Sequence, residues 1–230
     1  MGIIKYIKEA KELIKSIKER DPAARSSAEI VLLYPGFRAV MHYRIAHWFY
    51  KHKRFFIARY ISQRARHKTG IEIHPGAIIG RNLFIDHGMG VVIGETAEIG
   101  DNCIIYQGAT LGGTGKDKGK RHPTLGDDVL VGTGAKILGP IKIGNNSKIA
   151  GGAVVLHKIP ENSTAVGVPA RIVRIGSEKV KKAFENCTGD LDQINIPDPV
   201  EQEICMLKKR VLELEHMLAK AGDNENLKGR

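Results

Sequence analysis

The fold is decided by residues 125–155, LGDDVLVGTGAKILGPIKIGNNSKIAGGAVV, in which every sixth residue is aliphatic. Glycine or another small or polar residue follows most of these positions. The six-residue step continues toward the amino terminus, and the complete ladder consists of Ile73, Ile79, Ile85, Val91, Ile93, Ile99, Ile105, Leu111, Leu125, Val131, Ile137, Ile143, Ile149 and Val155. Such a period with glycine at the corners is typical of a parallel β-helix, whose short flat strands bury one aliphatic residue per face. An α-helix would repeat near 3.6 residues and an open-sheet strand every two, so neither fits.

The ladder has two irregularities. Its phase slips by two residues between Val91 and Ile93, and the step from Leu111 to Leu125 is fourteen residues instead of twelve or eighteen. The second irregularity contains residues 112–123, GGTGKDKGKRHP, a glycine-rich cationic segment with no apolar residue to bury. Loops on a rigid scaffold often carry binding and chemistry. We therefore expect a functional loop here, the alternative being a solvated basic loop.

Composition favours a soluble cytoplasmic protein. The first twenty residues, MGIIKYIKEAKELIKSIKER, lack the long apolar core and the cleavage site of a signal peptide. No uncharged apolar run is long enough to span a membrane, so no membrane partner is expected. The three cysteines, Cys103, Cys187 and Cys205, form an odd set without metal-ligand spacing, which fits a reducing compartment.

The formal net charge of +11 is concentrated at the amino terminus. Residues 1–68 contain sixteen Lys or Arg against five Asp or Glu, and the rest of the chain is balanced at twenty each. A basic segment can indicate nucleic-acid binding. However, these cations alternate with helix-forming apolar residues, and no nucleic-acid motif accompanies them. A solvated helical face, with some attraction for an anionic cofactor, accounts for the charge better.

The pattern predicts an α+β protein of three parts. Residues 1–68 form an amino-terminal helical domain, residues 69–176 a β-helix, and residues 177–230 a polar linker followed by a carboxyl-terminal helix. The expected helices cover residues 2–20, 23–33, 37–51, 54–67 and 200–220. Residues 171–175 are expected to form a last strand or cap.

Two phosphate-binding motifs and a zinc site are not supported. Lys116 is followed by Asp117 instead of Ser or Thr, which excludes a Walker loop, and Gly88-Met89-Gly90 lacks the third glycine of a dinucleotide fingerprint. His74, His87 and His122 lie in or beside the β-helix. Any one of them alone is most simply a surface histidine, and no two histidines between residues 70 and 160 have the four-residue spacing of a paired zinc site.

Several motifs in order resemble the serine O-acetyltransferases. They are Glu72-Ile73-His74-Pro75, then IDHGMGVVIGETA (residues 85–97), LGGTGK (111–116), KRHP (120–123) and GVPAR (167–171), with RDPA (20–23) and YPGF (34–37) upstream. The resemblance covers roughly residues 20–175. It implies a left-handed parallel β-helix with hexapeptide repeats.

The resemblance implies transfer of acetyl from acetyl-CoA to the hydroxyl of L-serine, the entry step to cysteine. Acetyl-CoA would be a co-substrate, and neither a permanently bound cofactor nor a metal is expected. Family members form trimers with active sites between neighbouring β-helices, and longer members pair trimers through their helical domains. L-Cysteine differs from serine only by sulfur for oxygen, so it is expected to inhibit at the same pocket.

The resemblance also assigns site residues. His87 would be the general base, and Glu72, where many members carry Asp, would hold its imidazole. Asp21 and Asp86 would bind the ammonium group of serine, while Arg121, helped by His122, would bind its carboxylate. The loop residues expected to let the cofactor approach the backbone are Gly112, Gly113, Thr114, Gly115 and Lys116.

Two other functions stay open at this point. A hexapeptide acetyltransferase for a sugar or a xenobiotic alcohol would not need Asp21, Asp86 and Arg121 around a zwitterion. A β-helix scaffold without catalysis would not bind acetyl-CoA.

The carboxyl-terminal tail has an apolar heptad seam of its own. Its positions are Val200, Ile204, Leu207, Val211, Leu214 and Leu218. A helix this short is marginal alone, so the seam predicts either a three-stranded coiled coil in a trimer or packing against the chain's own coils. Members that bind cysteine synthase insert a tail ending in isoleucine. Residues 226–230, NLKGR, do not favour that mode of binding.

Overall fold

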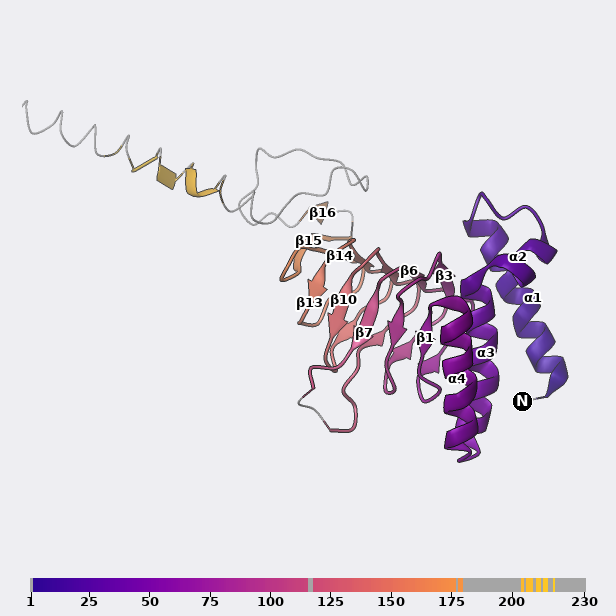
Figure 1. The fold of residues 1–230 in the computed structure, drawn as a ribbon. Coiled ribbons are helices and arrows are strands. Elements are labelled where there is room, and N and C mark those ends of the chain that lie inside the picture. Colours follow the sequence, from indigo (N-terminus) through magenta and orange to yellow (C-terminus); the bar gives the residue numbers. More distant parts are fainter. Residues whose placement is uncertain are drawn as a thin grey trace, which may run out of the picture. The chain divides into compact units, whose positions relative to one another are not determined.

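The computed structural model describes residues 2–115, 118–176 and 178–179, together with residues 204, 206–208, 210–211, 213–214 and 217 of the tail. The chain divides into two compact units, Met1–Ser177 and Glu178–Arg230. The first unit contains four helices and a parallel β-helix (Figure 1). No helix in the described part of the chain combines the length and apolar composition required to cross a membrane.

Four helices precede the β-helix. They are α1 (Ile3–Arg20), α2 (Ser27–Leu33), α3 (Pro35–Lys51) and α4 (Phe55–Thr69). The second begins four residues later than expected, because the side chain of Ser26 accepts the backbone N–H of Glu29 and caps the helix there. Pro35 starts α3, the position where a helix does not need its missing N–H. Gly70, in a left-handed conformation, ends α4.

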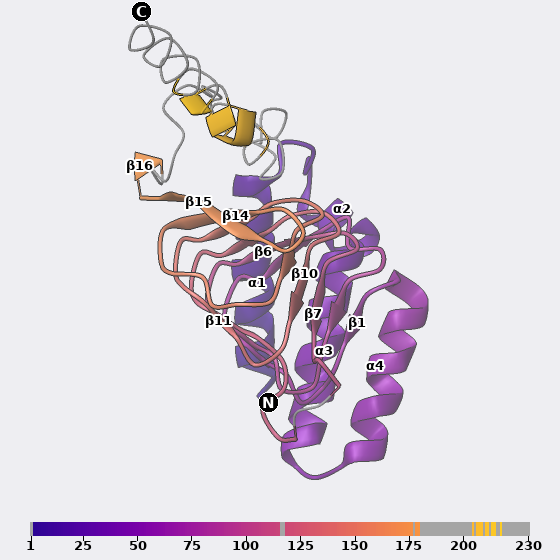
Figure 2. The same cartoon turned by 90° about the vertical axis from the view of Figure 1, so that its left-hand side faces the viewer.

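The β-helix has three faces, each a sheet of short strands. The first face stacks β1 (Glu72–Ile73), β4 (Val92–Ile93), β7 (Thr110–Gly112), β10 (Lys136–Leu138) and β13 (Val154–Val155). The second face stacks β2 (Ile78–Ile79), β5 (Glu98–Ile99), β8 (Thr124–Leu125) and β11 (Lys142–Ile143). The third face stacks β3 (Phe84–Asp86), β6 (Ile104–Tyr106), β9 (Leu130–Val131), β12 (Lys148–Ile149), β14 (Ser163–Val166) and β15 (Arg171–Ile175). Figure 2 looks along the stack from the β14–β15 end and shows the three faces around a common core.

The aliphatic ladder forms that core. All fourteen predicted positions are buried, and Ile93, Ile105 and Ile137 have no exposed surface. Equivalent residues of successive coils pair in parallel register, for example Ile73 with Ile93 and Ile85 with Ile105. The prediction of a left-handed parallel β-helix of about five coils is confirmed.

Each irregularity of the ladder lies at a corner of the prism. Val91 is buried but lies in the turn before β4, and the strand residue that follows it is Ile93. The step from the third face to the first is therefore eight residues here, from Ile85 to Ile93, whereas it is six residues in the next coil, from Ile105 to Leu111. The two extra residues lengthen the corner between the third and first faces, which we call the His87 corner (residues 87–91 and their counterparts in other coils). The long step contains the loop of residues 113–123, which projects from the stack in Figure 1. It leaves the corner between the first and second faces, which we call the Arg121 corner (residues 74–77, 94–97 and 113–123).

The helical domain covers the open edge of the first coil. Hydrogen bonds between coils run in both directions along the stack, for example from His74 N–H to Ile93 O and from Gly90 N–H back to Gly70 O, and the first coil has no preceding coil to pair with. Tyr43 donates to Ala77 O at 2.7 Å, and Arg44 donates to Ile79 O at 2.6 Å. Two further bonds, from Ser62 to Ile73 O at 2.7 Å and from His47 to Pro75 O at 2.8 Å, continue the pattern. These side chains satisfy an edge that would otherwise pair with another strand.

The other end of the stack closes differently. The expected last strand is β15, which turns back and pairs antiparallel with β14. The turn between them is the segment Gly167–Ala170 that closes the coil.

The second unit contains β16 (Glu178–Lys179) and helical residues of the tail. Four predicted seam residues, Ile204, Leu207, Val211 and Leu214, are helical and exposed. Val200 and Leu218, the ends of the predicted seam, lie outside the described residues, as does the tail end at 226–230.

Candidate functional site

His87 occupies a tight turn at the end of β3. Its φ of 55° lies in the left-handed region, which is uncommon for residues other than glycine. The turn closes because Gly88 N–H donates to the carbonyl of Asp86 at 2.6 Å. Gly88 follows at φ 80°, and a side chain there would overlap Ile71. The turn therefore fixes an exposed imidazole on a rigid coil, the arrangement needed by a group that meets a substrate.

Two carboxylates and two phenols gather beside this corner. Asp21 follows α1, and its Oδ2 accepts the Tyr34 hydroxyl at 2.7 Å. Burial first, then the hydrogen bond to Asp21 and the charges of Asp21 and Asp86, raise the pKa of Tyr34 to about 12. The pKa of Tyr106 is also raised, by burial first and then by the same two carboxylates. Both aspartates act on both phenols, so Asp21 and Asp86 lie on the same side of this corner. A paired carboxylate site suits an ammonium group.

Glu72 points to a different partner from the one expected. Its Oε2 pairs with Arg66 Nε of α4 at 3.3 Å, and among the described residues no hydrogen bond joins Glu72 to His87. The Arg66 side chain is 56% exposed, so this ion pair is a weak one. A carboxylate can accept several hydrogen bonds, which leaves Oε1 able to accept another donor.

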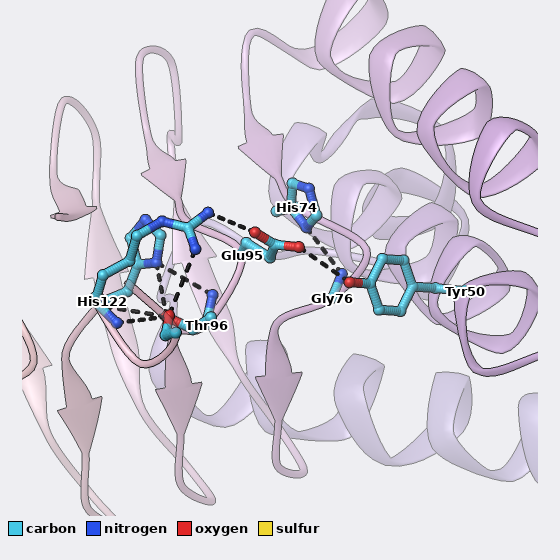
Figure 3. Close-up of polar contacts among 8 residues, drawn as sticks. Tyr50, His74, Gly76, Glu95, Thr96 and His122 are labelled. Carbon is cyan, nitrogen blue, oxygen red and sulfur yellow. Dashed lines mark hydrogen bonds and ion pairs between the residues drawn. The ribbon is translucent and has the colours of Figure 1, made fainter. Parts of the chain in front are cut away.

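At the Arg121 corner, Arg121 forms an ion pair with Glu95. The Nη2 group donates to Glu95 Oε2, and the other oxygen, Oε1, accepts the Tyr50 hydroxyl at 3.0 Å. The hydrogen bond from Arg121 lowers the pKa of Glu95, so this carboxylate is ionised. Figure 3 shows Glu95 between His122 and Thr96 on one side and Tyr50 and His74 on the other.

His122 is buried, with 8% of its surface exposed. Its Nδ1 accepts the Thr96 backbone N–H at 3.1 Å, and Thr96 Oγ1 accepts the backbone N–H groups of His122 and Arg121 at 3.1 and 3.0 Å. Burial, and secondarily the charge of Arg121, lowers the pKa of His122. The ring is therefore neutral and holds its proton on Nε2. A side chain at Gly94 would overlap this ring, so glycine is required beneath it.

The glycine-rich loop leaves the first face after β7. Gly112 O accepts Gly139 N–H at 2.9 Å, which ties the start of the loop to the next coil. Gly115 has φ 80°, and a side chain there would meet open space. Gly113 and Thr114 are half-buried and exposed, respectively. Lys116, the remaining residue predicted to bind the cofactor, lies outside the described residues.

One chain does not bring all the predicted residues together. Asp21, Asp86 and His87 lie at one corner, whereas Arg121 and His122 lie at the next, across the first face. From Val91 to Glu95 the chain covers roughly 13 Å at ~3.3 Å per residue. The two groups of charges thus flank a whole face of the prism.

Sequence reasoning missed the residues that support these groups. Tyr50 and Tyr106 have no motif around them, and Tyr34 belongs to the recognised YPGF motif but was given no role; only their contacts reveal one. Glu95 and Thr96 belong to a motif that was recognised, but without any role for either side chain. Gln107 follows Tyr106, the partner of Asp86 in the next coil, and its Oε1 is buried without a hydrogen-bond partner among the described residues.

Comparison with known proteins gives consistent matches. The family model of the bacterial transferase hexapeptide (six repeats) matches residues 122–157. A serine acetyltransferase of Bacillus licheniformis is 52% identical over 222 residues, which is 96% of this chain and 100% of that protein.

Solved structures agree with the sequence relatives. The serine acetyltransferase of Neisseria gonorrhoeae in complex with serine superposes with a TM-score of 0.72 and 42% identity, over 75% of this chain and 70% of that one. A serine acetyltransferase complex with cysteine has a TM-score of 0.73 and 42% identity, over 75% and 71% of the two chains. A complex with CoA has a TM-score of 0.71 and 41% identity, over 74% and 71%.

Proposed function

The chain belongs to the serine acetyltransferase family, and we propose that it carries out the family's reaction at a site shared between neighbouring copies of the chain. It is an acyltransferase, and its reaction moves acetyl from acetyl-CoA to the hydroxyl of L-serine. The products are O-acetyl-L-serine, an intermediate of cysteine biosynthesis, and CoA.

His87 is the proposed general base. A hydroxyl attacks a thioester only if its proton is removed as the bond forms, and an imidazole that titrates near neutral pH suits this task. The exposed position in a fixed turn supports the assignment. The tetrahedral intermediate then collapses, the thiolate of CoA leaves, and the imidazolium returns the proton to it.

Glu72 is the proposed partner of that imidazole. A carboxylate would fix the tautomer and stabilise the imidazolium. For this, Glu72 must share its carboxylate with Arg66 or release it, and the exposure of Arg66 makes either change inexpensive.

The serine zwitterion explains the two groups of charge. Asp21 and Asp86 bind its ammonium group, and Arg121 binds its carboxylate through the planar fork of the guanidinium. The neutral His122 adds an N–H donor from Nε2. A sugar or a xenobiotic alcohol has neither charge and would leave these groups uncompensated, which favours serine as the acceptor.

The distance between the His87 corner and the Arg121 corner is the main support for a shared site. One amino acid cannot contact the His87 corner and the Arg121 corner of the same chain across the first face. If the His87 corner of one copy faces the Arg121 corner of the next, a single serine reaches all of them. A three-sided prism can do this around a three-fold axis, so we propose a homotrimer, alone or paired with a second trimer.

Acetyl-CoA is the proposed co-substrate, with no permanently bound cofactor. The loop residues Gly112, Gly113, Thr114 and Gly115 allow close approach to backbone amides, and the neighbour that holds CoA supports this choice. L-Cysteine, which a neighbour also holds, is proposed as an inhibitor at the serine site. We place the protein in the cytoplasm.

One assay separates the alternatives. CoA release is measured with acetyl-CoA and serine, homoserine or a sugar as acceptor. Release with serine well above the other two supports the proposal, release with the sugar favours the other acetyltransferase class, and no release or acetyl-CoA binding favours a scaffold. Mixing inactive His87→Ala and Arg121→Ala chains then tests the shared site, because mixed oligomers regain intact sites only if each site uses two chains.

A further inference from the structure

Tyr34 joins the start of α3 to the connection that follows α1. It is the last residue before α3, and its half-buried ring packs against the core. Its hydroxyl donates to Asp21 Oδ2 at 2.7 Å. Burial and the neighbouring carboxylates raise the pKa of Tyr34 to about 12, so the phenol keeps its proton and remains a donor. The bond therefore ties Asp21, which lies between α1 and α2, to a second part of the helical domain.

We propose that Tyr34 is a positioning residue that holds the Asp21 carboxylate in the orientation that binds the ammonium group of the acceptor. The inference rests on the proposed function, because that function assigns Asp21 to the ammonium group. It adds a residue that acts through Asp21 without touching the substrate, and that strengthens the preference of the site for an amino acid over a hydroxy acid.

The side chain of Asp21 needs such a partner because of where it lies. The backbone is fixed by α1, since Asp21 N–H donates to Ile17 O at 2.8 Å where the helix ends. The side chain, however, leaves a turn whose next two residues, Pro22 and Ala23, are exposed. A side chain that becomes ordered only when the ligand binds lowers the affinity. The hydrogen bond from Tyr34 orders the carboxylate beforehand.

The hydrogen bonds of Asp21 leave its carboxylate able to bind. Oδ1 accepts the backbone N–H of Ala23 at 2.8 Å, and Oδ2 accepts the Tyr34 hydroxyl. An ionised carboxylate has about four acceptor positions, so these two bonds use about half of them. Each oxygen is held by one donor and can still accept from an ammonium group. Tyr34 and Ala23 thus fix the plane of the carboxylate without blocking it.

The segment that carries Tyr34 is itself fixed against β3, the strand that carries Asp86. Gly36 lies directly on this strand, and a side chain there would overlap Ile85 O, the carbonyl just before Asp86. Glycine is therefore required for the approach. A tyrosine side chain has few rotatable bonds, so the ring carries this fixed position over to Asp21. The placement of the two carboxylates relative to each other thus depends on Tyr34.

The variant Tyr34→Phe isolates the hydroxyl, because phenylalanine keeps the ring that packs against the core. The KM for serine should rise by roughly three- to tenfold, the effect of losing one ordinary hydrogen bond. Both kcat and the KM for acetyl-CoA should stay near their parent values, because the hydroxyl contacts neither the base nor the loop of residues 113–123. Steady-state kinetics with each substrate varied in turn measures all three constants.

A ligand without an ammonium group separates this role from a general loss of structure. β-Hydroxypropionate has the hydroxyl and the carboxylate of serine but no ammonium group for Asp21 to bind. Its inhibition constant in competition with serine should therefore be the same in Tyr34→Phe and in the parent. A general loosening of the acceptor site would weaken the binding of both ligands together.

Tyr60→Phe is the matched control. Tyr60 lies on α4 with an exposed side chain, and its ring faces the guanidinium of Arg64 at 5.9 Å. This variant also removes one tyrosine hydroxyl from the helical domain. It should leave the KM for serine, the KM for acetyl-CoA and kcat unchanged.

A double-mutant cycle links Tyr34 to Asp21. Asp21→Asn removes the charge that attracts the ammonium group and should raise the serine KM by itself. If Tyr34 acts through Asp21, adding Tyr34→Phe to Asp21→Asn should change the serine KM by much less than Tyr34→Phe does in the parent.

Three results would overturn the inference. They are an unchanged serine KM in Tyr34→Phe, a parallel rise of the inhibition constant for β-hydroxypropionate, and fully additive effects in the cycle. If Asp21→Asn itself leaves the serine KM unchanged, the assignment of Asp21 in the proposed function fails instead.

Discussion

His122 Nδ1 accepts the backbone N–H of Thr96 at 3.1 Å. This one bond decides the chemistry of the ring, because a nitrogen that accepts cannot also hold the proton. The proton is then on Nε2, and the imidazole is a neutral donor at the Arg121 corner. If Nδ1 were protonated, its N–H would face the backbone N–H of Thr96 with no acceptor between them.

Stability should therefore fall on acidification. In the unfolded chain His122 has its ordinary pKa of 6.5, and burial lowers its pKa in the folded chain. As the pH falls from 6.5 through the folded pKa, the unfolded state binds more protons than the folded state does. The free energy of unfolding therefore decreases over this range. His47 and His74, whose pKa values burial also lowers, act in the same direction.

The variant His122→Asn isolates this contribution. The asparagine carbonyl can accept the Thr96 N–H and does not titrate. Thermal unfolding from about pH 7.5 to about pH 5.5 should show a smaller drop in Tm for the variant than for the parent. Equal drops would mean that His122 does not contribute.

Replacing His87 with Ala should lower kcat by roughly a hundredfold to ten-thousandfold, the usual contribution of a general base. The turn should persist and acetyl-CoA should bind as before, because the side chain is exposed. Steady-state kinetics and acetyl-CoA titration measure both. His157→Ala, at another exposed histidine of the β-helix, is the control. Near-normal turnover of His87→Ala would show that the base is elsewhere.

Arg121→Lys keeps the charge and loses the fork. The serine KM should rise far more than the KM for acetyl-CoA, and inhibition by cysteine should weaken in parallel. Arg81→Lys changes another forked arginine, which bonds to Asp101 at 2.6 Å on a corner outside the site, and should leave both constants unchanged. A rise confined to acetyl-CoA would mean that the loop contacts the cofactor.

Gly94→Ala should damage the acceptor site. The added methyl group would overlap the buried His122 ring, so the ring or the coil must move. We expect a higher KM for serine. The free energy of unfolding should fall by about 1–3 kcal/mol, as at other overpacked sites, and the Tm should fall with it. Gly151→Ala is the control, since its added carbon would meet Thr133 O at an ordinary 3.4 Å. A variant that behaves like the control would refute the tight packing.

Deleting residues 198–230 tests the tail. If the apolar seam forms a coiled coil, the deletion should lower trimer stability and leave catalysis largely intact. Sedimentation across a dilution series and Tm measure the first effect, and CoA release the second. Unchanged Tm and trimer Kd would rule out the coiled coil.

The core was predictable because a β-helix repeats. Ile105 on the third face and Ile137 on the first face each occupy the inward position of a strand, so their burial follows from the period alone. The two irregular corners follow from the period too, since the steps from Ile85 to Ile93 and from Leu111 to Leu125 are longer than six residues. Such departures from a strict repeat mark the corners that carry His87 and Arg121, the candidate site residues.

The partners of charged side chains were not predictable. Glu72 was expected beside His87 and instead contacts Arg66, an arginine of α4 with no motif around it. Arg121 was expected to bind a substrate, and nothing in its own segment indicated that Glu95, on an earlier coil, holds it. These pairings depend on how coils and helices stack, and local sequence does not encode that arrangement.

The side chains that cover the first coil also decide how long the solenoid can be. A stack of parallel coils has no intrinsic length, because every added coil offers the next one the same row of backbone N–H and C=O groups. Tyr43, Arg44, His47 and Ser62 bond to four carbonyls of the first coil, which a further strand would have to win from them. The helical domain is thus a terminator that keeps a polymer-like architecture finite and protects it from end-to-end growth into fibrils.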